Sequence, residues 1–149
     1  YSAEVAGGLE TAGGIIQALP VLGNEPFLVV NGDIWTDFPF ADFAKIELST
    51  EQLCHLVMVN NPAHNPAGDF YLDSEGLLSL EGEPKLTFSG IGIYRPEMFA
   101  EHPVAKRALK PFFVEVMKQK KATGQHYQGQ WSDIGTVERL TVLAKQLDI

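Results

Sequence analysis

The sequence has one cysteine, few basic residues and no long apolar run. Cys54 stands alone among 149 residues, which excludes an intrachain disulfide framework and a metal site built from several cysteines. Lys and Arg total 11 against 19 Asp and Glu, a net charge of −8, so we expect no binding to nucleic acid or to an anionic membrane. No apolar stretch is long enough to span a bilayer and no signal peptide is visible, so we expect a cytoplasmic protein.

Several catalytic signatures are also missing. The sequence has no G-x-S-x-G elbow, no Walker lysine loop and no G-x-G-x-x-G run, which argues against an α/β-hydrolase, a P-loop enzyme and a standard dinucleotide-binding protein. Its four histidines show no metal spacing such as H-x-x-x-H. We interpret His64 as a solvated loop residue and Cys54 as buried and unreactive.

Alternating strand and helix signals predict an α/β domain. The run Phe27–Val30 is apolar at every position, which predicts a central strand buried on both faces. Pro20 is expected to end the first helix, and Gly124 to follow the end of the third. Strands are predicted at 27–30, 53–59, 70–73, 77–80, 86–94 and 127–131, and helices at 11–19, 40–46, 111–121 and, after a Thr136 cap, to about 147.

Two aspartates each follow a predicted strand. Asp33 ends the segment VNGD, and ligands in α/β sheets collect beyond the carboxyl ends of strands. Asp133 lies in WSDIGT, just before the last helix. The alternatives are a turn aspartate bonded to its own backbone at 33, and a helix-capping arrangement at 133 and Thr136. Together, the two carboxylates could share one Mg²⁺, which favours oxygen ligands and commonly takes one or two protein carboxylates.

The segment LETAGGI, residues 9–15, opens the first helix with small residues. Gly13 and Gly14 are poor helix formers, which suggests that something packs close to the backbone. A flat ring or a phosphate could approach the backbone amides there. The alternative is a loop-to-helix junction in which Thr11 is simply the cap.

Four segments, taken in order, resemble the sugar-phosphate nucleotidyltransferases: LETAGGI, FLVVNGDIWTD, LTFSGIGIYRP and WSDIGTVERL. The resemblance covers essentially the whole chain. It implies a Rossmann-like nucleotidyltransferase fold, with a mixed, mainly parallel sheet flanked by helices. It also implies a reaction in which a sugar 1-phosphate attacks the α-phosphorus of a nucleoside triphosphate and pyrophosphate leaves.

The resemblance implies roles for particular residues. Asp33 and Asp133 would be the catalytic pair that holds Mg²⁺. The substrates that the resemblance favours are UTP and N-acetylmuramate 1-phosphate, in recycling of peptidoglycan sugars, because of the segments LETAGG, NNPAHNPAGDF and SGIGIYRP. The alternative is guanylyl transfer to mannose 1-phosphate. The nucleotide would contact Leu9, Glu10, Thr11, Gly13 and Gly14, and the sugar would contact Gly90, Asn60 and Asp69.

The sequence also departs from the family pattern. The family's glycine-rich loop (L-A-A-G-x-G-x-R-M) lies upstream of the segment that matches LETAGG, and Glu83 stands where many members carry a sugar-phosphate lysine. We therefore expect residues 1–149 to be the C-terminal two-thirds of a single, N-terminally truncated domain that is inactive by itself. A non-catalytic nucleotide-sugar-binding domain is the alternative. Because a central strand without its neighbours exposes an edge, we expect a homo-oligomer or complementation by the N-terminal segment.

Overall fold

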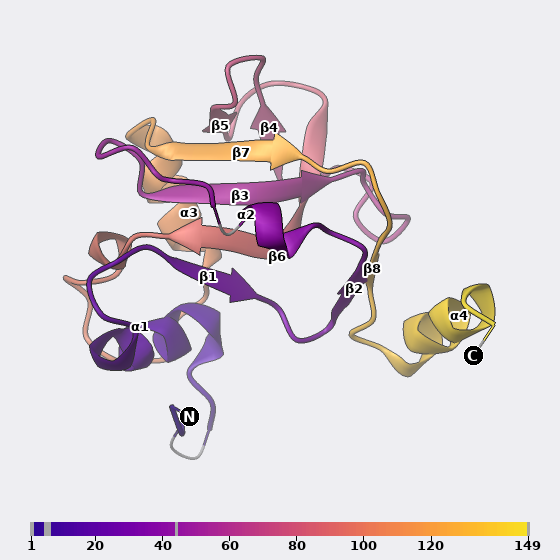
Figure 1. Ribbon diagram of the computed structural model, residues 1–149, viewed down its shortest axis with the longest axis horizontal. Helices are drawn as coiled ribbons and strands as arrows, with labels where there is room; N and C mark the ends of the chain where they lie inside the picture. Colours follow the sequence, from indigo (N-terminus) through magenta and orange to yellow (C-terminus); the bar gives the residue numbers. More distant parts are fainter. Residues whose placement is uncertain (1, 5–6, 44, 149) are drawn as a thin grey trace.

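The computed structural model describes residues 2–4, 7–43 and 45–148 (Figure 1). Its centre is a six-stranded mixed sheet in the order β5-β4-β6-β3-β7, with β1 on the same edge of β6 as β4. The strands are β1 (Phe27–Val30), β3 (Cys54–Val59), β4 (Phe70–Leu72), β5 (Leu78–Ser79), β6 (Lys85–Tyr94) and β7 (Ala122–His126).

Four of the six strands in the main sheet run in the same direction. β1, β3 and β4 each run antiparallel to β6, and β7 runs parallel to β3, so these four strands share one direction. β5 and β6 run the opposite way. Among the described strands, β3 and β7 are the one parallel pair joined directly by hydrogen bonds.

Two apolar clusters cover the two faces of the sheet. Alternate residues of a strand point to opposite faces, and Leu56 and Met58 join one cluster while Val57 joins the other. Helices α1 (Glu10–Leu22) and α3 (Lys110–Lys118) bury their apolar faces in the first cluster. The short helix α2 (Phe40–Phe43) contributes Phe43 to the second cluster. The sheet therefore has the helix-covered faces of an α/β domain.

A separate antiparallel ribbon lies at one end of the main sheet (Figure 1). It consists of β2 (Ile34–Thr36) and β8 (Trp131–Asp133), with Ile34 opposite Asp133 and Thr36 opposite Trp131. The ribbon leads into α4 (Val137–Gln146), which projects away from the sheet. A 3₁₀ turn, η1 (Pro96–Met98), follows β6. None of the described helices is both long and apolar enough to cross a membrane.

Four local predictions were wrong. The strand β1 is not buried on both faces: its alternate side chains point to opposite faces, and Leu28 and Val30, on the same face, are about 40% exposed. The helix α1 passes through Pro20 and ends at Leu22, where Gly23 caps it. Pro20 has no amide hydrogen to donate to the carbonyl four residues earlier, so the helix continues past it without that bond.

The strand predicted at 127–131 is instead two strands, β7 and β8, on either side of that segment. Gly124 does not mark the end of α3, which stops at Lys118, but lies within β7 opposite Leu56. A Cβ at Gly124 would lie 2.9 Å from the carbonyl oxygen of Leu56, so a side chain there would force the two strands apart. The other predicted elements are present with shifted ends.

Candidate active site

The β2–β8 ribbon brings Asp33 and Asp133 together. The backbone carbonyl of Asp33 accepts a 2.8 Å hydrogen bond from the amide of Ile134. Oδ2 of Asp33 and Oδ1 of Asp133 each lie 3.1 Å from the point that a Cβ would occupy at Gly135. These two oxygens are therefore no more than about 6 Å apart, twice that distance. Asp33 follows the end of β1 and Asp133 is the last residue of β8, so the two carboxylates come from two strand ends, as predicted, although β8 belongs to the ribbon and not to the main sheet.

A cavity of about 310 Å³ opens beside the two carboxylates. Polar groups of Asn31, His64, Asn65 and Thr87 line it, together with Gly90 and the aromatic rings of Phe88 and Trp131. The indole Nε1 of Trp131 donates a 2.9 Å hydrogen bond to the carbonyl of Ser89, which fixes the ring against β6. The site thus combines acidic groups, neutral hydrogen-bonding groups and an apolar wall, as small-molecule sites do.

Three neighbours hold the carboxylate of Asp133. Oδ1 accepts a 2.9 Å hydrogen bond from the amide of Gly135, and Oδ2 lies 2.9 Å from Arg139 Nη1 and 3.4 Å from His64 Nε2. The capping interpretation is confirmed for Thr136, whose hydroxyl accepts a 3.3 Å hydrogen bond from the amide of Arg139 at the start of α4. Asp133 therefore has a local backbone bond on Oδ1, the oxygen nearest the Gly135 Cβ position, and contacts with Arg139 and His64 on Oδ2.

The donor set fits a magnesium ion better than a transition metal. Over the part of the chain that the structure describes, no three His, Cys, Asp or Glu side chains gather closely enough to enclose a metal. Two carboxylates remain, and an oxygen of each lies 3.1 Å from the point that a Cβ would occupy at Gly135, which has no side chain of its own. Mg²⁺ is commonly bound in this way, by one or two carboxylates with waters and substrate phosphates completing its shell.

The predicted nucleotide-binding segment packs against its own chain. A Cβ at Gly13 would lie 2.2 Å from the carbonyl oxygen of Ala105, and one at Gly14 would lie 2.7 Å from the Glu4 carboxylate. The close packing inferred at these glycines is real, and in this structure the neighbours are protein atoms. Leu9 is buried and precedes α1 as its N-cap.

Glu10 and Thr11 are exposed in the first turn of α1. Thr11 is not the helix cap, because Leu9 takes that position without a side-chain hydrogen bond. Thr11 lines a second cavity of about 200 Å³, which also includes Asn31 and Asp69. Asn31 and Phe88 line both cavities, so the cavity that Thr11 lines adjoins the one beside the carboxylates, whose lining does not include Thr11.

The three predicted sugar-binding residues are not all placed together. Gly90 lines the cavity of the carboxylates, and its positive φ of +84° and the Asn31 side chain 2.8 Å from a Cβ there leave no room for a side chain. Asp69 lines the second cavity and accepts a 3.0 Å hydrogen bond from the amide of Phe88. Asn60 lies outside both cavities and bonds His126 at 3.0 Å.

No family model matches the sequence. The chain is 53% identical over 147 residues to N-acetylmuramate alpha-1-phosphate uridylyltransferase of Neisseria meningitidis serogroup B. By sequence, the chain is therefore a homologue of that uridylyltransferase. A protein of the same name from Caulobacter vibrioides is 29% identical over 137 residues. The two alignments cover 94% and 85% of this chain but only 63% and 57% of those proteins.

Solved structures support the fold of this homologue. HddC from Yersinia pseudotuberculosis, crystallised in complex with GMP-PN, superposes with a TM-score of 0.72 at 18% sequence identity. The superposition covers 96% of this chain and 64% of HddC. The Rossmann-like nucleotidyltransferase fold predicted from the four motifs is therefore confirmed.

Among the site residues that sequence reasoning missed, two contact Asp133 directly. His64 is exposed, as predicted for a loop histidine, but its Nε2 also reaches Asp133 and Arg139. No sequence pattern indicated a role for Arg139. The one available signal was its position three residues after the Thr136 cap, which places it in the first turn of a helix that starts beside Asp133.

The β2–β8 ribbon of this homologue is braced on its outer side by Asp37. Its carboxylate accepts hydrogen bonds from the hydroxyl of Tyr127 and, at 2.7 Å, from the amide of Gln130. The Tyr127 bond lowers the pKa of Asp37, and the same bond raises the pKa of Tyr127 to about 12. The brace ties the two chain segments of the ribbon at the end opposite Asp33.

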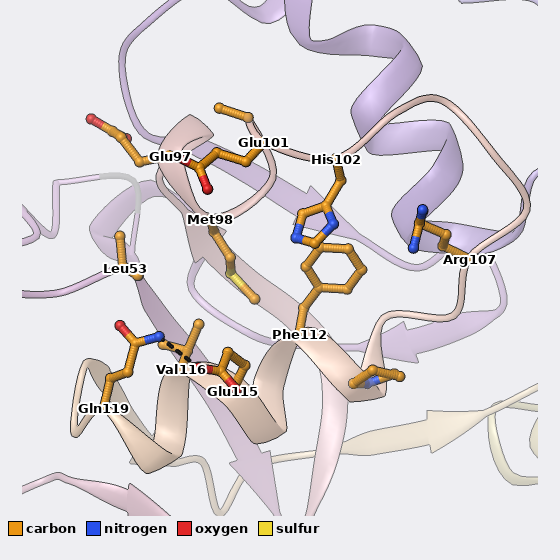
Figure 2. Close-up of a pocket in the computed structure, with 12 residues that line it drawn as sticks. Leu53, Glu97, Met98, Glu101, His102, Arg107, Phe112, Glu115, Val116 and Gln119 are labelled. Atoms are coloured by element: carbon orange, nitrogen blue, oxygen red, sulfur yellow. Dashed lines mark hydrogen bonds between the residues drawn. The ribbon is translucent and has the colours of Figure 1, made fainter.

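A third cavity, larger than the two described above, contains neither aspartate. It measures about 590 Å³ and lies between η1, the following loop and α3. Figure 2 shows the ring of His102 over that of Phe112 and the hydrogen bond between Gln119 and Glu115. Arg107 also lines this cavity, and its Nε is buried with no hydrogen-bond partner in the described part of the chain.

Proposed function

We propose that this chain forms the metal-binding and sugar-binding part of a nucleotidyltransferase that uses UTP and N-acetylmuramate 1-phosphate. The products are a UDP-sugar and pyrophosphate. The observation that carries the proposal is the approach of Asp33 and Asp133 to within about 6 Å beside a polar cavity. The 53% identity to a uridylyltransferase of that name supports the choice of substrates.

The proposed reaction depends on positioning the two substrates and neutralising the phosphate charge more than on proton transfer. The attacking oxygen belongs to a phosphate monoester, which is largely ionised near neutral pH, so no general base has to activate it. Asp33 and Asp133 would hold Mg²⁺. When bound, this ion neutralises the charge of the phosphate oxygens and reduces their repulsion toward the nucleophile.

The other cavity residues would orient the sugar phosphate. Asn65 and Thr87 are already joined by a 3.1 Å hydrogen bond, and they present fixed donors and acceptors to hydroxyl or amide groups. Trp131 and Phe88 supply flat apolar surfaces that exclude water from one side of the cavity. Holding the nucleophile in line in this way removes much of the entropic barrier of a two-substrate reaction.

We also propose that residues 1–149 alone do not turn over. The sequence contains no glycine-rich loop with an accompanying lysine that would surround a triphosphate with backbone amides. The same observation supports a second candidate, a domain that binds nucleotide sugars without catalysis. Calorimetric titration with a UDP-sugar separates the two when combined with the assay below: binding without turnover in the completed protein would favour the second candidate.

The decisive experiment is reconstitution. The chain is fused behind the N-terminal part of the Neisseria meningitidis protein that it does not cover, and pyrophosphate release is measured with UTP and N-acetylmuramate 1-phosphate. GTP with mannose 1-phosphate tests the alternative specificity. Asp33→Asn and Asp133→Asn should each reduce the rate about a hundredfold or more, whereas Asp42→Asn on exposed α2 should not.

The proposal fails if the fusion releases no pyrophosphate with any sugar phosphate or nucleoside triphosphate. A wild-type rate in either aspartate variant would remove that residue from the metal site while leaving the rest of the proposal standing.

A further inference from the structure

Arg139 is the positive group that faces the carboxylate pair. Its Nη1 lies 2.9 Å from Asp133 Oδ2, and the same nitrogen lies 3.3 Å from His64 Nε2. The Arg139 side chain is 34% exposed and that of Asp133 is 28% exposed. The pair is therefore partly shielded from water, where charges interact more strongly than at an open surface.

Three charged atoms surround the space left free at Gly135. Asp33 Oδ2 and Asp133 Oδ1 lie 3.1 Å from the point that its Cβ would occupy, and Arg139 Nη2 lies 3.8 Å from it. A divalent cation between the carboxylates would therefore lie only a few ångströms from the guanidinium. Like charges at this distance repel strongly, so Arg139 has to leave the space when the cation enters.

The neighbouring cavity offers the guanidinium a second partner. Among the residues that line it, none is a lysine or an arginine. A phosphate bound there would therefore depend on Arg139, which already touches the lining residues Asp133 and His64. The planar guanidinium can give a phosphate two parallel hydrogen bonds, which a lysine ammonium cannot.

We infer that Arg139 is a place-holding cation with two partners. Without metal, it neutralises Asp133; once a divalent ion occupies the carboxylates, its guanidinium turns into the cavity and binds the phosphate of the sugar 1-phosphate. This inference rests on the proposed function and gives it a specific phosphate-binding residue. It requires that loss of Arg139 has opposite effects on the two ligands, since the residue competes with one and binds the other.

Two binding measurements on the full 149-residue chain test the inference. The first follows Mn²⁺, as a paramagnetic substitute for Mg²⁺, by electron paramagnetic resonance. The second follows N-acetylmuramate 1-phosphate by calorimetry at saturating Mn²⁺. Arg139→Gln should bind Mn²⁺ about tenfold more tightly than the wild type and the sugar phosphate about tenfold more weakly.

Two further variants separate this role from a structural one. Arg139→Lys keeps the charge but not the paired donors, so it should keep the wild-type Mn²⁺ affinity and still weaken sugar-phosphate binding. Lys145→Gln removes a positive charge from the last turn of the same helix and should change neither affinity. Circular dichroism shows whether α4 is retained in each variant.

The inference is overturned if Arg139→Gln weakens Mn²⁺ binding or leaves both affinities unchanged, or if Lys145→Gln reproduces its effects. Absence of Mn²⁺ binding by the wild-type chain would be a different result, because it would refute the proposed metal site itself.

Discussion

The backbone of Asp33 is hydrogen-bonded to the residue beside Asp133, and the side chains of the two aspartates border the same empty space. The carbonyl of Asp33 accepts its bond from the Ile134 amide at 2.8 Å. Gly135, one residue further, supplies the space between the carboxylates because it has no side chain. The geometry of the pair is thus fixed by a strand register and one glycine, and both can be perturbed separately.

Gly135→Ala should weaken binding of a divalent ion. The added methyl group would lie 3.1 Å from one oxygen of each carboxylate and would occupy the space that the ion needs. Changes around a metal site typically cost tenfold to a hundredfold in affinity, and we expect about tenfold here. Mn²⁺ titration measures the effect. Gly32→Ala is the matched control, because a Cβ there meets nothing within 4 Å; equal affinities for the two variants would contradict the prediction.

Gly13→Ala should destabilise the fold. The new Cβ would lie 2.2 Å from the carbonyl oxygen of Ala105, a backbone atom that cannot rotate away, so α1 has to shift. Overpacking of this kind costs about 1–3 kcal/mol, more than the roughly 1 kcal/mol that alanine gains over glycine in a helix. Urea unfolding measures the change.

The neighbouring variant Gly14→Ala is the control for that experiment. Its Cβ would meet only the end of the flexible Glu4 side chain, so the free energy of unfolding should stay constant or rise. If Gly13→Ala is as stable as Gly14→Ala, the close contact with Ala105 is not present in solution.

The stability of the protein should fall below about pH 6.5 in part because of His55. Burial lowers the pKa of its imidazole from the ordinary 6.5, while the bond to Gln125 opposes this shift. As the pH falls through 6.5, His55 takes up a proton in the unfolded chain but not in the folded chain. The free energy of unfolding therefore decreases until the pH passes the lower pKa of His55 in the folded chain.

His55→Gln should flatten this dependence between pH 7.5 and 5.5 in urea titrations. The exposed His102→Gln variant should keep the wild-type slope. The slope is the decisive quantity, because the substitution also changes stability at every pH. An unchanged slope in His55→Gln would show that this side chain is not buried as described.

The free edge of β1 should make the chain self-associate. Within the described residues β1 pairs only with β6, and its apolar Leu28 and Val30 are 40% and 42% exposed. Val30→Lys should reduce association, since a lysine on an edge strand opposes further pairing. Light scattering over a range of concentrations measures it. Val142→Lys, on exposed α4, is the control. A wild-type chain that stays monomeric would refute the prediction.

Much of the fold follows from local sequence patterns. The apolar runs, turn residues and helix caps predict most of the elements, and the spacing of VNGD and WSDIGT predicts two acidic corners. Burial of β1 could not be judged in this way, because four apolar residues do not reveal whether a helix or another layer covers each face of the strand. β7 was missed because its sequence, ATGQH, has few apolar residues. It is a strand because it pairs with β3.

The partners of Asp133 were beyond the reach of local patterns. His64 and Arg139 are 75 residues apart in the chain and meet only after the sheet and the ribbon have formed. No periodicity links them, and each has an ordinary explanation in its own segment, one as a loop histidine and the other as a residue in the first turn of a helix. Contacts of this kind appear only in three dimensions.

The ribbon of β2 and β8 also has a consequence for synthesis of the protein. Strands β3 to β7 lie between the two strands in the sequence, so the chain through residue 133 must leave the ribosome before the two aspartates can meet. A nascent chain that stalls before β8 can build much of the main sheet and still lack its pair of carboxylates. Such a chain would be partly folded and would lack the candidate active site.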